Sequence, residues 1–203
     1  MMDAQTKSLI QKIVLTPENH ARWLNTLSFL EHIGSRKIIK SQKSEKLDLM
    51  VLEHIAEETR HAFYIKKLAQ KISPDTCPTY EEDYLLAGNN AEKYFQQLDQ
   101  KISEILSRQY AGQGISLLTY LYVTLLVEER AIGVYRVYET VLEENHFAIS
   151  VKPILAEEQR HLKQMRELLS EYDAHYEVNH KQFQDIECTF YHLLMEQLNA
   201  VVH

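Results

Sequence analysis

Two nearly identical pentapeptides carry the residues of this chain best suited to chemistry. Residues 57–61 read Glu-Glu-Thr-Arg-His and residues 157–161 read Glu-Glu-Gln-Arg-His, so four of the five places agree. In each copy an imidazole follows the second carboxylate by three residues, a spacing that puts both side chains on one face of a helix. A carboxylate and an imidazole together suit a divalent ion such as iron, manganese or zinc. The two pairs are Glu58 with His61 and Glu158 with His161.

Each pair is in phase with the apolar residues of its own helix. Steps of three and four residues through the apolar positions of 51–65 reach both members of the first pair, and the same steps through 154–168 reach the second. The acid that precedes each pair falls about 100° away, toward a flank, so we expect it beside the site. The arginine inside each pentapeptide is expected to form a surface ion pair. These flanking residues are Glu57, Arg60, Glu157 and Arg160.

Two further carboxylates are expected on neighbouring helices, because two carboxylates alone do not complete a dinuclear carboxylate site. Glu31 is the only acid on the apolar stripe of its helix, and Gly34 three residues later leaves room beside it. Glu128 lies on the apolar stripe of another helix, where Glu129 is the alternative. The face of Glu129 leads to Arg136, a poorer core position, so Glu128 is favoured.

The elements that must position these residues are all helices. Apolar residues recur at spacings of three and four, no segment alternates with period two, and the chain has only 5 Gly and 4 Pro. The pattern predicts an all-α single domain over 1–203, with four long helices joined by one long crossover at roughly 73–113. One additional helix lies in the crossover and another at the C-terminus. The predicted helices cover 3–14, 17–41, 44–72, 90–108, 114–143, 151–172 and 178–201.

Composition excludes several classes of protein. The 203 residues carry 22 Lys and Arg against 29 Asp and Glu, a net charge of −7 without a basic run, which argues against nucleic-acid binding and against docking on a membrane. No signal peptide or spanning segment is evident, so a cytoplasmic location is expected. Cys77 and Cys188 are too few for a cysteine-only metal centre. We expect reduced thiols, with a single bridge as the alternative.

The six metal-ligand candidates form a recognisable set. They are Glu31, Glu58, His61, Glu128, Glu158 and His161. This set resembles the ligands of the ferritin-like di-iron carboxylate proteins, in which two helices each give one Glu and two others each give Glu-x-x-His; the resemblance spans about 140 residues. It implies a ferritin-like bundle that holds two iron ions, with manganese or a mixed pair as alternatives. Glu58 and Glu158 would bridge the ions, and Glu31 and Glu128 would be terminal.

The resemblance also implies a function. Two reduced iron ions would activate O2 to oxidise a small organic substrate, with a further protein as electron donor. Tyr135 and Tyr64 are candidates for transferring an electron or proton near the site, although most of the 12 tyrosines are expected to pack in the core or an interface. His54, one turn before Glu58 and nearly on its face, could reach the site, but we expect it at the surface or just outside the ligands.

Two other functions remain open at this stage. A ferroxidase, an iron-storage shell or a peroxide-detoxifying protein would use the same ligands, and a non-catalytic bundle would keep them as a relic. An apolar stripe through 183–198 predicts that the last helix packs either on the bundle or across a homodimer.

Overall fold

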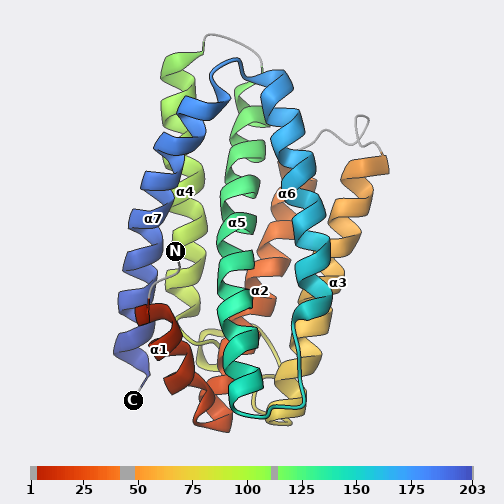
Figure 1. The fold of residues 1–203 in the computed structure, drawn as a ribbon, viewed down its shortest axis with the longest axis vertical. Coiled ribbons are helices and arrows are strands. Elements are labelled where there is room, and N and C mark those ends of the chain that lie inside the picture. The colour runs from red at the N-terminus through yellow and green to blue at the C-terminus, as the bar shows by residue number, and fades with distance from the viewer. Residues whose placement is uncertain (1–3, 42–48, 111–113, 203) are drawn as a thin grey trace.

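The helices form at the places that the apolar pattern predicts. The computed structural model describes residues 4–41, 49–110 and 114–202, and these contain seven α-helices, one short 3-10 helix and no strand (Figure 1). The elements are α1 (Ala4–Val14), α2 (Pro17–Ser41), α3 (Leu49–Ile72), η2 (Glu82–Tyr84), α4 (Gly88–Gln109), α5 (Ile115–Glu144), α6 (Lys152–Tyr172) and α7 (Tyr176–Val201). The all-α prediction is confirmed. Residue 3 and residues 44–48, also predicted to be helical, lie outside the described residues.

Proline and glycine mark several helix boundaries. Pro17 begins α2, where its missing N–H costs nothing, and α6 also has a proline in its first turn. Gly114 precedes α5 with a φ of 115°, a left-handed conformation that suits glycine because it lacks a Cβ. The long helices therefore start and stop where the local sequence favours it.

The helices pack as a bundle with a crossover. In Figure 1, α2 and α3 form an antiparallel hairpin, and α5 and α6 form a second one. Between the hairpins, η2 and α4 carry the chain back along the length of the bundle, so α3 and α5 run in the same direction. α7 packs beside α4 and α5, and α1 packs against α2 and α5. Within the described residues, no helix is both long and apolar enough to cross a membrane.

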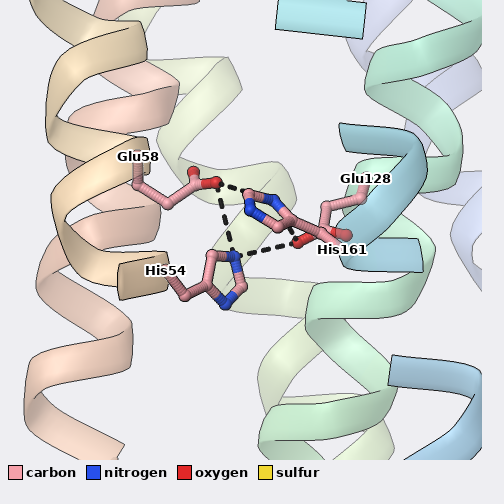
Figure 2. A group of neighbouring side chains, drawn as sticks. All are labelled: His54, Glu58, Glu128 and His161. Carbon is pink, nitrogen blue, oxygen red and sulfur yellow. Dashed lines mark ion pairs between the residues drawn. The ribbon is translucent and has the colours of Figure 1, made fainter. Parts of the chain in front are cut away.

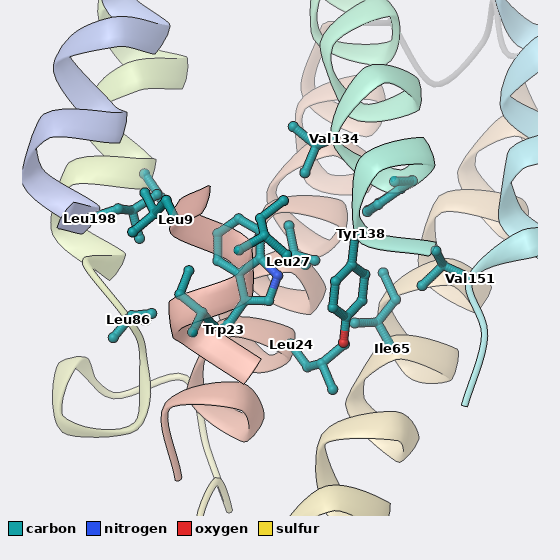
Figure 3. Packing of buried hydrophobic residues seen from close by; sticks show 14 of the residues in the cluster. Leu9, Trp23, Leu24, Leu27, Ile65, Leu86, Val134, Tyr138, Val151 and Leu198 are labelled. Carbon is teal, nitrogen blue, oxygen red and sulfur yellow. The ribbon is translucent and has the colours of Figure 1, made fainter. Parts of the chain in front are cut away.

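Two apolar clusters fill the interior at different heights. One cluster contains Trp23, Leu24, Ile65 and Tyr138 near one end of the bundle (Figure 3). The other contains Ile38, Val51, Leu125 and Leu169, among further residues, toward the other end. On α2, α3 and α6 the candidate acids and histidines fall between the stretches that supply the two clusters. The polar centre is thus enclosed by apolar packing above and below it.

The two cysteines do not form a disulfide bond in the structure. Cys77, in the segment that follows α3, is buried, and Cys188 lies on α7. Both are free thiols, as expected for the reduced form.

Candidate metal centre

Four helices bring the six candidate ligands together into two adjacent groups. The first group is Glu31, Glu58, His61 and Glu158, and the second is His54, Glu58, Glu128 and His161. In each group, one donor atom from every residue lies within 4.8 Å of the others. Glu58 belongs to both groups, so its carboxylate stands between them. This arrangement resembles a dinuclear metal site.

Every one of these side chains is buried. The most exposed, Glu31, keeps only 8 % of its surface, and Glu158 and His161 keep 1 %. Polar atoms in such positions almost always have hydrogen-bond partners. Among the described residues, however, seven atoms that face the centre have none: Oε1 of Glu58, both carboxylate oxygens of Glu128, Oε2 of Glu158, Nε2 of His54 and Nδ1 of His61 and His161.

These unpartnered atoms lie close to one another and to the other carboxylate oxygens of the two groups. His61 Nδ1 is 2.9 Å from Glu158 Oε1, and His54 Nε2 is 3.1 Å from Glu128 Oε1 (Figure 2 shows the second group). They approach without the directional geometry of hydrogen bonds. Donors that converge on a common centre without satisfying one another are what a metal ion requires, so the residues present fit two divalent ions.

Without metal, protons balance the buried acids. Burial raises the pKa of Glu31 well above its usual range, with the neighbouring Glu58 and Glu158 adding to the effect. Burial likewise raises the pKa of Glu128 to about 7. Burial alone would raise the pKa of Glu158, but the adjacent His161 and His61 lower it to about 2.

The histidines supply the compensating charge. Burial lowers the pKa of His61, but Glu158 and Glu31 outweigh this and raise it to about 10. In the same way Glu128 and Glu58 outweigh burial and raise the pKa of His54 to about 10. Imidazolium groups therefore occupy positions where a bound cation would replace their protons.

The flanking acids pair crosswise between the two pentapeptides. Nε2 of His61 donates to Glu157 Oε2 at 2.7 Å, and Nε2 of His161 donates to Glu57 Oε2 at 2.7 Å. Each imidazole donates here because an ionised carboxylate can only accept. Donation from Nε2 leaves Nδ1 as the ring nitrogen that faces the centre, so the flanking acids fix both the orientation and the tautomer.

The arginines of the pentapeptides complete this pairing. Arg60 donates to Glu157 at 2.5 Å, and Arg160 donates to Glu57. Both arginine side chains are about half exposed, 54 % and 45 %. The expected surface ion pairs are therefore present, and each joins α3 to α6.

Glu128 and Glu129, the two alternative ligands on α5, lie in different environments. Glu128 is buried in the second group. Glu129 lies outside both groups, where it accepts from Arg166 at 2.8 Å and pairs with His180 at 3.1 Å. The structure therefore places Glu128, and not Glu129, at the centre.

The two candidate tyrosines form hydrogen bonds in different places. Tyr135 is buried and its hydroxyl donates to Oε1 of Glu31. The hydroxyl of Tyr64 instead donates to the backbone carbonyl of Ser150 at 2.8 Å. Of the two, only Tyr135 contacts a member of the groups.

His54 corrects an expectation from the sequence. It lies neither at the surface nor outside the ligands: it keeps 4 % of its surface, and Nε2 lies 3.4 Å from Glu58 Oε1. The signal for it was present, because residues four apart on a helix share a face. The second pentapeptide has no histidine four places before Glu158, so the internal repeat did not point to it.

A cavity of about 630 Å³ leads to the centre from one side. α2, α4, α5 and α7 line it, mostly with apolar side chains, and it reaches Glu31, Glu58, Glu128 and Glu158. Its lining includes the exposed residues Lys40, Ser107 and Ser116 at the end where α4 stops and α5 starts. Within the described residues, His61 and His161 are not part of the lining. The cavity thus approaches the carboxylates and His54, while the crosswise ion pairs lie on the far side of His61 and His161.

Comparison with known proteins adds no family. No family model matches the chain, and neither a curated protein nor a solved structure is significantly similar to it. The similarity to di-iron carboxylate proteins therefore rests on the residues and their geometry alone.

Proposed function

We propose that this chain is a single ferritin-like domain that works as a dinuclear non-haem iron oxidase or oxygenase. The observation that carries the proposal is the pair of buried donor groups that share Glu58 and direct unpartnered atoms at common centres. The order of elements supports the fold: a lone Glu on α2 and on α5, a Glu-x-x-His on α3 and on α6, and a crossover between the hairpins.

The ligands divide between two metal positions. Glu31, Glu158 and His61 would hold one ion, and Glu128 and His161 the other, with Glu58 shared. Four carboxylates carry a charge of −4, which two divalent ions neutralise. Iron suits this mixture of oxygen and nitrogen donors, and manganese is the nearest alternative. Bound iron would supply the redox chemistry that activates O2.

The rest of the chain positions the reactants. The apolar cavity admits the substrate on the carboxylate side and excludes water from the reacting atoms. Because α2 rises about 1.5 Å per residue, the lining from Trp23 to Lys37 runs for about 20 Å past the centre, which favours an elongated, mainly apolar substrate. Tyr135 donates to Glu31 and so holds a proton beside the centre. We propose O2, such a substrate and an electron-donor protein as partners.

Metal analysis tests the proposal. Metal-free protein is loaded with Fe(II) under argon, and bound iron per chain is measured after desalting, before and after exposure to air. We expect two irons per chain, O2 uptake and a change in the absorption spectrum. Glu58→Gln should lower the iron content, whereas the control Glu53→Gln, an exposed acid on the same helix, should bind iron as the unaltered protein does.

The same experiment separates the alternatives. Binding of no iron would contradict the proposal and leave a bundle with a relic site. Uptake far beyond two irons per chain, in a large assembly on size-exclusion chromatography, would identify iron storage. The cavity favours the oxidase, because a storage protein needs no apolar chamber of this size beside its metals.

A further inference from the structure

The repeat that builds the centre is broken at one position. The two pentapeptides supply matching residues to both groups, but His54, four places before Glu58, corresponds to Ile154, four places before Glu158. Ile154 belongs to an apolar cluster and is 2 % exposed. The two halves of the centre are therefore unequal in their nitrogen donors.

His54 is aimed at the second group only. Its Nε2 lies 3.1 Å from Glu128 Oε1 and 3.4 Å from Glu58 Oε1, and its ring centroid is 4.2 Å from that of His161. Nε2 has no hydrogen-bond partner among the described residues, although the side chain is more than nine-tenths buried. On the other side of the ring, the Tyr120 hydroxyl lies 3.4 Å from Nδ1. Nε2 is therefore the nitrogen available to an ion.

We propose that His54 is a third histidine ligand that only one of the two metal positions has, so that the two positions differ in how strongly they favour one metal over another. This inference rests on the dinuclear site proposed above. The first position offers three carboxylates and one imidazole, from Glu31, Glu58, Glu158 and His61. The second offers two imidazoles and two carboxylates, from His54, His161, Glu58 and Glu128.

The donor sets predict the direction of the preference. Carboxylates suit manganese, whereas imidazole suits zinc, copper, iron and nickel, and the affinity of a given site rises from manganese to cobalt along the divalent series. The second position should therefore favour Co(II) over Mn(II) more strongly than the first position does. A symmetric centre would have the same cobalt-to-manganese ratio at both positions.

The three histidines also differ in what supports them. The Nε2 atoms of His61 and His161 donate hydrogen bonds to carboxylates. Such partners raise the basicity of an imidazole ligand. The corresponding partner of His54 is the neutral hydroxyl of Tyr120, which lies 3.4 Å from Nδ1. His54 therefore has the weakest hydrogen-bond support of the three imidazoles.

Anomalous diffraction tests the inference without any measurement of activity. Crystals of metal-free protein are soaked in equimolar Co(II) and Mn(II), and data are collected at both absorption edges. We expect a higher cobalt-to-manganese ratio in the position bounded by His54 than in the other, with His54 Nε2 at bonding distance. Equal ratios at the two positions, or a His54 side chain turned away from the ion, would overturn the inference. Absence of metal from both positions would instead overturn the proposed dinuclear site.

Solution titration gives a second measurement. Calorimetry with Co(II) alone should resolve two classes of site in the unaltered protein. In His54→Gln, the tighter class should lose about tenfold or more in affinity, the size of effect that disturbing metal coordination commonly produces, while the weaker class is unchanged. His192→Gln, an exposed histidine on α7, serves as the control. Two unchanged classes in His54→Gln would contradict the inference, and the crystal result above does not depend on the variant folding.

Discussion

Glu57 on α3 accepts a hydrogen bond from Nε2 of His161 on α6 at 2.7 Å, across the bundle and 104 positions along the chain. The reciprocal bond joins His61 to Glu157. The first residue of each pentapeptide thus orients the last residue of the other. This explains why the repeated unit is five residues long, when the ligands alone require only four.

The crosswise bonds predict the effect of removing one flanking acid. Glu57→Gln keeps the volume but replaces the carboxylate that accepts from both His161 and Arg160. We expect metal affinity at the second position to fall about 10- to 100-fold, the usual result of losing such a partner. Calorimetric titration with Co(II) measures this change. Glu53→Gln on the exposed face of α3 should bind as before; equal affinities in both variants would mean that Glu57 does not support the ligand.

The raised pKa values predict release of protons when metal binds. Burial lowers the pKa of His54 and His61, but the facing carboxylates raise both to about 10, so both imidazoles carry protons at neutral pH in the metal-free protein. A metal ligand must be deprotonated. Metal affinity should therefore rise between pH 6 and 8. Titration calorimetry in buffers of different ionisation enthalpy measures the protons released; an identical heat in every buffer would contradict this.

The same groups predict how the stability of the metal-free protein depends on pH. A histidine whose pKa is raised on folding stabilises the fold fully below its unfolded value of about 6.5. This contribution is lost as the pH rises through the folded value of about 10. Glu128, raised to about 7, acts in the same direction, because burial favours its protonated form. Urea unfolding from pH 6 to 10 should show falling stability, and saturating metal should flatten the decline.

The two tyrosines allow a matched pair of variants. Tyr135→Phe removes the hydroxyl that donates to Glu31, and Tyr64→Phe removes one that donates to the Ser150 carbonyl away from the centre. Each lost hydrogen bond should cost about 1 kcal/mol of unfolding free energy in the metal-free protein. Only Tyr135→Phe should also weaken metal binding at the first position. A loss of metal affinity in Tyr64→Phe would show that the effect is not specific to Glu31.

The variant Gly34→Ala should lower metal binding without lowering the stability of the metal-free protein. A Cβ at this position would lie 3.2 Å from Oε2 of Glu58, closer than most Cβ contacts allow. Gly34→Ala should therefore displace the carboxylate that both groups share. Because alanine favours a helix over glycine by about 1 kcal/mol, the metal-free variant should unfold at the same or a higher temperature. Thermal unfolding and iron content measured together test this, and iron content equal to that of the unaltered protein would contradict it.

The sequence predicted the helices well because their apolar residues repeat with the period of a helix over more than 20 residues. The six candidate acids and histidines lie on buried faces, because each is in phase with an apolar stripe. His54 was not selected as a ligand because no partner in the repeat marks it. The pairing of Glu57 with His161 could not be read from the sequence either, since it depends on how α3 and α6 are rotated against each other. The cavity is the space left between side chains of four helices, which periodicity does not describe.

The helices that line the cavity are partly different from the helices that carry the donor groups. α4 and α7 wall the cavity but contribute no residue to either donor group. Substitutions at positions such as Phe95 or Leu194 can therefore reshape the cavity while the helices that carry the donor groups stay as they are. Replacing the lining would change which molecules fit the cavity without changing the donor atoms that it reaches.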